Sequence, residues 1–388
     1  MTQSEEKKSQ ASIVQPHASP IVQTSVYDYP DLESLDDFYE GRMPNGFLYS
    51  RNGLPNSKEL GELVAASEET ESGAVCSSGM AAITVAILSA LKSGDTIVAS
   101  NDVYGGTSSL LKDELPRFQI NTTFADSTSI DEMEGAIQNG SKMVIVETIS
   151  NPTMKVCDIP AISEIVRKRG AILLVDNTFA TPFIVKPAKL GANVVIHSGT
   201  KYLGGHDDLT IGLLCGKKEW ISRASQFCTR SGSMAGPFDS WLATRSFATW
   251  ELRVRQCNTN AVKLARFLES KNNKISKVFY PGLDSHPQHD TAKRIFSNGM
   301  YGGMLSFDLK GGYPSANRFV KALKRVTLTP SLGGVHTTIS HPGKTSHRFL
   351  NAEEKNRLGI TDSMIRVSVG IEGYSLIEQE FERALEAA

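Results

Sequence analysis

The chain has 388 residues, which is enough for a large hydrophobic core, and we expect one major domain and a smaller one. Its 41 basic and 42 acidic side chains leave a formal net charge of -1, which argues against a nucleic-acid or anionic-membrane partner and favours a small molecule. The five cysteines are scattered and lack CxxC spacing or flanking histidines, so neither a disulfide framework nor a zinc site is indicated.

The N-terminal 17 residues are polar and predict a flexible arm. No basic segment followed by an apolar run occurs there, and no stretch of the sequence has the length and apolarity of a membrane span, so we expect a cytoplasmic protein. Residues 20–44 carry aromatic side chains such as Tyr27 and Phe38 without a sustained period. An extension of this kind often reaches a second subunit, and a disordered tail is an equally good interpretation.

Apolar residues at helical spacing predict one helix over 55–67 and another over 81–91. Ser77, Ser78 and Gly79 precede the second helix. Backbone N–H groups and the positive end of the dipole at such a helix start can hold a phosphate. The motif is weak alone, because the same residues also begin ordinary helices.

Strands and helices then alternate as in a parallel sheet. Short apolar runs predict strands over 96–99, 122–125, 143–147, 172–175, 194–196 and 211–214. Tyr104, Asn151 and Asp176 come at or just after the ends of three of these strands. Because open α/β sheets bind ligands at the C-terminal ends of their strands, we expect these side chains to line one site.

The stretch VVIHSGTKYLGG, residues 194–205, places Lys201 after a buried strand and beside two hydroxyls. Most lysines are solvated surface charges. Ser198 and Thr200, however, can both donate to one anion, and a lysine beside them in a semi-enclosed site has a lowered pKa, as a lysine that attacks a carbonyl requires. Asp176, ordinarily a helix cap, then gains a second interpretation as the carboxylate that keeps a pyridine nitrogen protonated.

The C-terminal part begins near Trp250, with a helical pattern over 258–268 and short strands over 278–280 and 304–309. Three histidines in this part could suggest a metal site. No carboxylate or cysteine lies near them at ligand spacing, so we interpret them as solvated loop residues. They are His336, His341 and His347.

Taken together, these segments resemble the pyridoxal-phosphate enzymes of cysteine and methionine metabolism, a family that includes cystathionine γ-lyase, cystathionine γ-synthase and methionine γ-lyase. The likeness runs from about Tyr49 to Glu372 through YSRNGLPN, SSGMAAI, DVYGGT, ETISNP, VDNTFATP, HSGTKYLGGH, SLGG and RVSVGIE. It implies an α/β subunit of the fold-type-I, aspartate-aminotransferase-like class, with a mostly parallel sheet and a smaller C-terminal α/β domain. It divides the chain into an arm contacting a neighbouring subunit (1–48), a cofactor-binding domain (49–248) and a C-terminal domain (249–388).

The resemblance assigns pyridoxal 5'-phosphate as the cofactor and Lys201 as the lysine that bonds to its aldehyde. Asp176 would pair with the ring nitrogen, and Tyr104 would stack on the ring and assist proton transfer. The resemblance assigns phosphate binding to Gly79, Met80, Ser198 and Thr200.

Tyr49 and Arg51 look like the pair that reaches the phosphate of a neighbouring subunit's cofactor. Shared sites imply a homo-oligomer, at least a dimer, and the family is commonly tetrameric.

Ser331 and Arg366 match positions that hold the substrate carboxylate, for which the planar fork of arginine is suited. Tyr49 and Asn151 are assigned to both cofactor and substrate, and Asn151 would donate to the ring's phenolate oxygen.

We expect a carbon–sulfur lyase that acts by γ-elimination on cystathionine or a related substrate, giving a 2-oxo acid, ammonia and a thiol. A γ-replacement transferase and a methionine γ-lyase are the alternatives. Pro330 stands where cystathionine-handling members usually carry glutamate, Gly106 where several methionine γ-lyases have cysteine, and Asp207-Asp208 where Ser-Asp is usual, so the substrate stays open. A nucleotide-binding oxidoreductase is disfavoured, because no GxGxxG motif follows the first strand of this sequence. The intact Lys201 argues against a binding protein without turnover.

Overall fold

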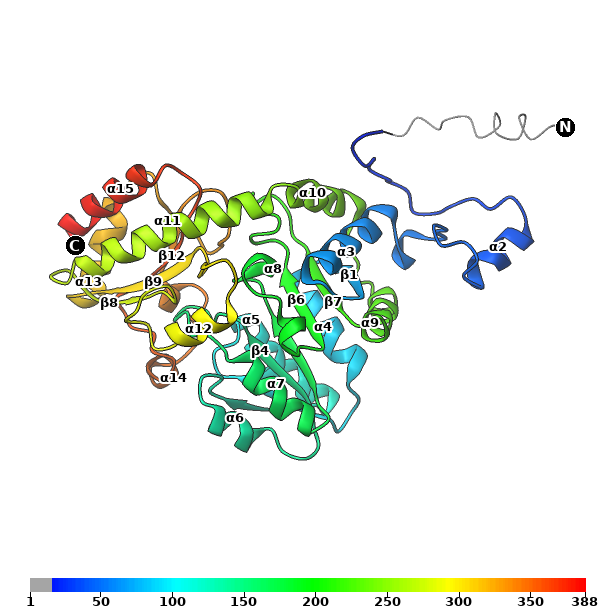
Figure 1. Ribbon diagram of the computed structural model, residues 1–388, viewed down its shortest axis with the longest axis horizontal. Coiled ribbons are helices and arrows are strands. Elements are labelled where there is room, and N and C mark those ends of the chain that lie inside the picture. The colour runs from blue at the N-terminus through cyan, green and yellow to red at the C-terminus, as the bar shows by residue number, and fades with distance from the viewer. Residues whose placement is uncertain (1–15) are drawn as a thin grey trace.

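The computed structural model describes residues 16–388, so nearly all of the expected flexible arm of residues 1–17 lies outside the described residues. Two sheets organise the described part, and the long helix α11 (Trp250–Ser270) runs from one to the other (Figure 1). The N-terminal segment with helix α2 (Leu32–Tyr39) extends away from both sheets. No described helix has the length and apolarity needed to cross a bilayer.

The larger sheet has seven strands in the order β1-β7-β6-β5-β4-β2-β3. They are β1 (Ser72–Cys76), β2 (Thr96–Ser100), β3 (Asn121–Ala125), β4 (Ser141–Glu147), β5 (Ile172–Asp176), β6 (Val194–Ser198) and β7 (Gly212–Gly216). Strands β2 to β6 pair in parallel, whereas β7 is antiparallel to both β6 and β1. The sheet is therefore mostly parallel, with the antiparallel strand β7 between β1 and β6. Strand β1 is not signalled by the sequence, because its first three residues, Ser-Gly-Ala, are small.

Helices cover both faces of this sheet. Its helices are α3 (Pro55–Glu68), α4 (Gly79–Ala90), α5 (Gly105–Ser109), α6 (Ile130–Ala136), α7 (Ile159–Lys168), α8 (Thr181–Ile184), α9 (Lys218–Ser231) and α10 (Pro237–Phe247). Alternate residues of β6 point to opposite faces, so Val195 joins one core cluster with α3 and α7, and Val194 and Ile196 join the other with α4 and α9. Burial on both faces explains the continuous apolar run of this strand.

The smaller sheet has five strands in the order β10-β11-β12-β9-β8. They are β8 (Ile275–Phe279), β9 (Met304–Leu309), β10 (Thr327–Leu328), β11 (Thr338–Ser340) and β12 (Met364–Ser368). The accompanying helices are α11, α12 (His289–Ile295), α13 (Gly312–Ala322), α14 (Ala352–Arg357) and α15 (Tyr374–Ala387). Phe307, Phe319 and Phe381 pack edge to face in its core. A mostly parallel α/β sheet with a smaller α/β part, as the sequence predicts, is confirmed.

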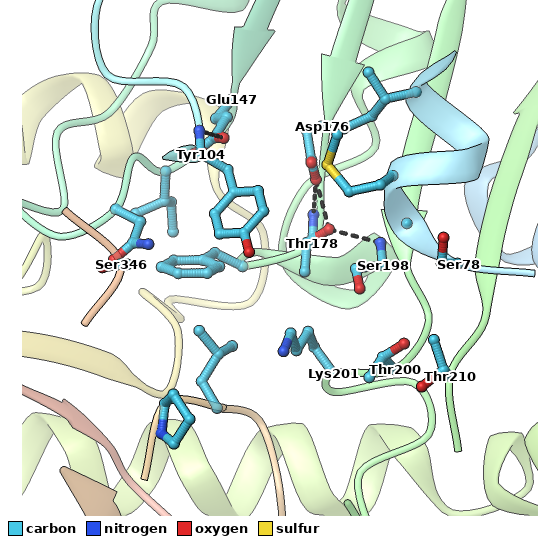
Figure 2. Close-up of a pocket in the computed structure, with 18 of the residues that line it drawn as sticks. Ser78, Tyr104, Glu147, Asp176, Thr178, Ser198, Thr200, Lys201, Thr210 and Ser346 are labelled. Carbon is cyan, nitrogen blue, oxygen red and sulfur yellow. Dashed lines mark hydrogen bonds between the residues drawn. The ribbon is translucent and has the colours of Figure 1, made fainter. Parts of the chain in front are cut away.

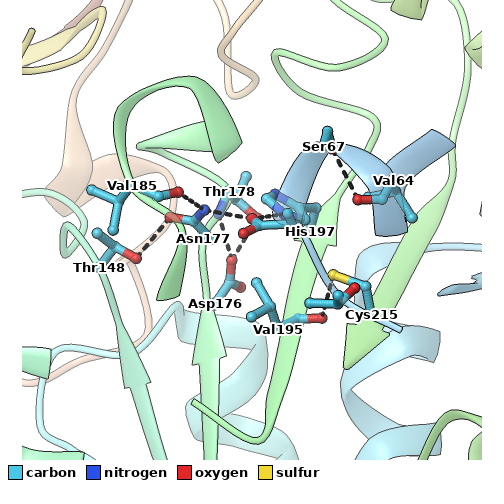
Figure 3. A network of polar contacts seen from close by, with 12 residues as sticks. Val64, Ser67, Thr148, Asp176, Asn177, Thr178, Val185, Val195, His197 and Cys215 are labelled. Carbon is cyan, nitrogen blue, oxygen red and sulfur yellow. Dashed lines mark hydrogen bonds and ion pairs between the residues drawn. The ribbon is translucent and has the colours of Figure 1, made fainter. Parts of the chain in front are cut away.

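A buried polar network ties α3 to the ends of β5 and β6 (Figure 3). Glu68 Oε1 lies 2.7 Å from His197 Nε2 and accepts a hydrogen bond of 2.7 Å from Asn177 Nδ2. Thr148 Oγ1 donates to Asn177 Oδ1 over 2.8 Å. The network fixes the chain where these two strands end, which is where Asp176 and the Lys201 loop emerge.

Candidate functional site

A cavity of about 520 Å³ lies at the C-terminal ends of β4, β5 and β6 and is closed by loops of the smaller sheet (Figure 2). Most of the site residues predicted from the sequence line it. These are Gly79, Met80, Tyr104, Asn151, Asp176, Ser198, Thr200, Lys201 and Arg366. Ser331 adjoins it, because Lys201 Nζ donates to Ser331 Oγ over 3.2 Å.

One end of the cavity is a cradle for an anion, built on the first turn of α4. Ser78 caps this twelve-residue helix by accepting from the backbone N–H of Ala81. A Cβ at Gly79 would lie 2.8 Å from the Cβ of Ser198, so only glycine allows the helix start and the Ser198 loop to approach this closely. The free N–H groups of the first turn and the hydroxyls of Ser198 and Thr210 therefore share one corner.

Thr200 holds this corner together as well as lining it. Its hydroxyl accepts from the backbone N–H of Ile211 over 3.0 Å, which joins the Lys201 loop to the segment entering β7. The loop is therefore braced on both sides, by Thr200 and by Ser198, whose N–H donates to Thr178 Oγ1 over 2.8 Å.

Lys201 points into the cavity from this loop. Burial lowers the pKa of its amine, the positive charge of Arg366 lowers it further, and the carboxylate of Asp207 opposes both. The amine is thus neutral at a lower pH than that of an ordinary lysine, which is the state in which it attacks a carbonyl or accepts a proton.

Two carboxyl groups stand at the inner end of the cavity on neighbouring strands. Asp176 on β5 and Glu147 on β4 are partners in the parallel register. Asp176 Oδ1 accepts from the backbone N–H of Thr178 over 2.9 Å and from its hydroxyl over 2.5 Å. Burial raises the pKa of Asp176 above its usual value although these bonds oppose the shift, whereas burial and then the charge of Asp176 raise the pKa of Glu147 well above its usual value. We assign the negative charge to Asp176 and the proton to Glu147.

Glu147 also positions Tyr104, since Glu147 Oε1 accepts from the backbone N–H of Tyr104 over 2.6 Å. Figure 2 shows the Tyr104 ring and the Lys201 side chain pointing into the same space. A Cβ at Gly106 would come within 2.7 Å of the Tyr104 ring and 3.0 Å of Met80 Sδ. Glycine at position 106 therefore leaves the room that this ring position needs.

Arg366 lines the cavity from β12 of the smaller sheet and is buried, with 3% of its surface exposed. Its Nη1 donates to Asn151 Oδ1 over 2.9 Å and its Nη2 to the Ser331 carbonyl over 3.4 Å. Its Nε has no hydrogen-bond partner among residues 16–388. Burial lowers the pKa of Arg366 to about 10, so the group stays charged at neutral pH and suits a carboxylate ligand.

Tyr49 and Arg51 are not brought to this cavity within one chain. They lie at η1 (Ser50–Asn52), where the Arg51 guanidinium sits 5.6 Å from the Tyr49 ring centroid. Arg51 Nη1 donates to the carbonyl of Thr229 over 3.2 Å, and Arg51 lines a second cavity of about 320 Å³.

Several lining residues are missed by sequence reasoning. Two of them could have been predicted, because they lie at or near the ends of predicted strands: Glu147 ends one strand, and Thr178 lies two positions after Asp176. Thr345 and Ser346 had none, because they reach the cavity from a loop of the smaller sheet only through tertiary packing.

The histidine interpretation needs correction. His336 is exposed, but His341 and His347 are buried, and each bonds to its own neighbourhood: His341 Nε2 to the Asp362 carbonyl and His347 Nδ1 to Ser346 Oγ. Within residues 16–388 no group of three or more His, Cys, Asp or Glu side chains is placed to hold a metal ion.

Comparisons with known proteins place this geometry in context. Residues 2–386 match the model of a family described as Cys/Met metabolism PLP-dependent enzyme. The chain is 39% identical over 368 residues to the cystathionine gamma-lyase of Bacillus subtilis (strain 168). It is 38% identical over 372 residues to the L-methionine gamma-lyase of Fusobacterium nucleatum subsp. polymorphum. Each alignment covers 95% of this chain and 93% of the relative. The crystal structure of cystathionine gamma synthase from Xanthomonas oryzae pv. oryzae in complex with cystathionine superposes with a TM-score of 0.90 at 32% identity, covering 95% of this chain and 93% of that one.

Proposed function

We propose that this chain, which belongs to the PLP-dependent enzymes of Cys/Met metabolism and so uses pyridoxal 5'-phosphate, is a carbon–sulfur lyase acting by γ-elimination. Its substrate would be cystathionine or a related sulfur amino acid, and its products a 2-oxo acid, ammonia and a thiol. The observation that carries the proposal is one cavity lined by a lysine of lowered pKa, a partly buried carboxylate, Asp176, and a buried guanidinium, Arg366.

The donor set of this cavity fits the cofactor. The first turn of α4 at Gly79 and Met80, together with Ser198, would hold the phosphate, because the Gly79 backbone allows the close approach that a bound anion needs. Both hydrogen bonds to Asp176 fall on Oδ1, which leaves Oδ2 for the ring nitrogen. Once bonded to the amino group of the substrate in place of the lysine amine, pyridoxal 5'-phosphate would withdraw electrons from the substrate's α-carbon and make the proton on that carbon acidic.

The residues of the chain would divide the reaction among them. Arg366 would bind the substrate carboxylate and so fix the α-carbon relative to Lys201. Lys201 Nζ would take the proton from Cα, and Tyr104 Oη or Lys201 Nζ would move the proton from Cβ, after which the γ-sulfur leaves as a thiol. Asp176 would keep the ring nitrogen protonated throughout.

The remaining wall of the cavity is apolar and suits a thioether chain. It is formed by Ile149, Phe179, Pro330 and Leu332. Elimination and replacement share nearly all of these steps, so a γ-replacement transferase is the second candidate, favoured by the structural similarity to cystathionine gamma synthase. Methionine γ-elimination is a variant of the first candidate, favoured by the L-methionine gamma-lyase relative.

The test is a product assay. The holoenzyme is incubated with cystathionine, methionine or O-acylhomoserine, with and without cysteine, and the products are identified by mass. We expect 2-oxobutanoate from cystathionine. Formation of cystathionine from the acylated homoserine, without 2-oxobutanoate from any substrate, would exclude the lyase in favour of the transferase.

We also propose that the enzyme is a homo-oligomer, at least a dimer and in full a tetramer, with residues 1–48 as an arm on the neighbouring subunit. Helix α2 has no buried residue, and its Leu32 and Tyr39 are 79% and 68% exposed, which favours a covering surface from a second chain.

The chain would divide into a cofactor-binding domain (49–248) and a C-terminal domain (249–388). Its five free cysteines support a reducing, cytoplasmic location.

A further inference from the structure

Two cysteines that are 152 positions apart in the sequence have their sulfur atoms in contact. Cys76 ends β1 and Cys228 lies in the last turn of α9, and their Sγ atoms are 3.8 Å apart. Both are buried, with 0% and 5% of their surfaces exposed. The contact is held by the main chain on either side of it, since Cys76 forms an antiparallel bridge with Met234 and the backbone N–H of Ser77 donates to the Ser233 carbonyl over 2.8 Å.

The two thiols differ in their access to solvent. Cys228 lines the second cavity, of about 320 Å³, together with Arg51 and Thr229. Cys76 is fully buried and is not among the residues that line this cavity. A small polar reagent entering the cavity would therefore meet Cys228 first.

The two thiols also differ in acidity. The hydrogen bond with Cys76 lowers the pKa of Cys228. The same contact, followed by burial, raises the pKa of Cys76. Because the thiolate is the reactive form of cysteine, Cys228 is the better nucleophile and Cys76 is placed to resolve the product.

We propose that Cys76 and Cys228 form an oxidisable dithiol site that reacts with hydroperoxides and closes to an intramolecular disulfide. The sulfur of Cys228 attacks one peroxide oxygen, the O–O bond breaks, and the departing hydroxide or alkoxide takes up a proton, leaving a sulfenic acid. The sulfur of Cys76 then attacks the sulfenic sulfur, the S–O bond breaks, and water leaves as the S–S bond forms. With hydrogen peroxide, two thiols lose two electrons and two protons, and the peroxide becomes two waters.

Formation of the disulfide between Cys76 and Cys228 would displace residues next to the phosphate cradle. The sulfur atoms must approach from 3.8 Å to about 2.05 Å. Cys76 is two residues before Ser78, the cap of α4, and Cys228 adjoins Thr229, whose carbonyl holds Arg51. This consequence rests on the proposed function, and we expect the oxidised holoenzyme to lose its cofactor several-fold faster on dialysis than the reduced form.

The site itself is tested without reference to activity. The holoenzyme is treated with graded hydrogen peroxide, its free thiols are alkylated under denaturing conditions, and the digest is mapped by mass spectrometry. We expect a cross-linked peptide pair containing Cys76 and Cys228, about 2 Da lighter than the sum of its thiol forms and reversed by dithiothreitol. In Cys76→Ser, Cys228 should instead be trapped as a sulfenic acid by dimedone.

Cys215→Ser is the matched control, because Cys215 is a buried free thiol in β7 and its removal should leave the cross-link intact. Full alkylation of Cys76 and Cys228 after peroxide treatment, or cross-links that do not involve this pair, would overturn the dithiol site. A cross-link with unchanged cofactor loss would refute its coupling to the cradle. A reduced protein that never binds pyridoxal 5'-phosphate would refute the proposed function and leave the cross-link result standing.

Discussion

Lys201 and Ser331 meet across the two sheets of the subunit, with Lys201 Nζ donating to Ser331 Oγ over 3.2 Å. Lys201 follows β6 of the larger sheet, and Ser331 lies between β10 and β11 of the smaller one. Neither sheet alone therefore forms the cavity. The packing of the smaller sheet sets the distance between the reactive amine and the residues that close over it.

Replacement of Lys201 by alanine removes the amine that would bond to the cofactor and move the α-proton. We expect activity to fall by at least about 10²- to 10⁴-fold, because the general base is lost. Borohydride reduction followed by peptide mapping should place the cofactor on Lys201 in the wild type and on no lysine in Lys201→Ala. Lys189→Ala is the control, since Lys189 lies in an exposed ion pair with Glu69.

The pH dependence of Lys201 offers a second prediction. The carboxylate of Asp207 raises the pKa of Lys201, so Asp207→Asn should lower it, and the amine should lose its proton at a lower pH. The rate at which the apoprotein takes up the cofactor, which needs the neutral amine, should then rise at a lower pH than in the wild type. Asp208→Asn is the neighbouring control. A profile that stays in place or moves to higher pH in Asp207→Asn would contradict the assignment.

The buried Glu68 should matter for stability. In Glu68→Ala, His197 Nε2 and Asn177 Nδ2 lose their acceptor inside the core, and the free energy of unfolding should fall by about 3–5 kcal/mol. Chemical denaturation followed by circular dichroism measures this change. Glu69→Ala is the matched control, since Glu69 is exposed and its ion pairs with Lys186 and Lys189 lie in solvent, so its loss should be much smaller. Equal losses in the two variants would refute a structural role for the network.

Much of this architecture could be predicted from periodicity and strand ends. Strands β5 and β6 are apolar on both faces, and Asp176, which ends β5, and Lys201, which follows β6, line the same cavity at the C-terminal ends of the strands. The family resemblance carried by the motifs is confirmed by the match over residues 2–386. Strand β1 escaped prediction because its pairing with β7, rather than its own small residues, makes it a strand.

The other features that the sequence does not predict also arise from tertiary packing. Ser346 lines the cavity only because its loop folds back over α5, where its carbonyl would lie 2.8 Å from a Cβ at Gly105. The contact between Cys76 and Cys228 joins residues of separate elements that share no sequence motif. Such relationships arise from packing between distant segments, which local patterns do not encode.

Shared sites give the last prediction. If Arg51 serves the cavity of a neighbouring subunit, Arg51→Ala and Lys201→Ala homo-oligomers should both be inactive, but a hybrid should hold one site with both native residues. Refolding an equal mixture should restore on the order of a quarter of the wild-type specific activity, since random pairing makes half of the dimers hybrid and each hybrid has one working site. Arg366→Ala mixed with Lys201→Ala is the control, because Arg366 and Lys201 line the same cavity of one chain and cannot complement each other. Activity that stays absent in the first mixture would place Arg51 outside the partner's site.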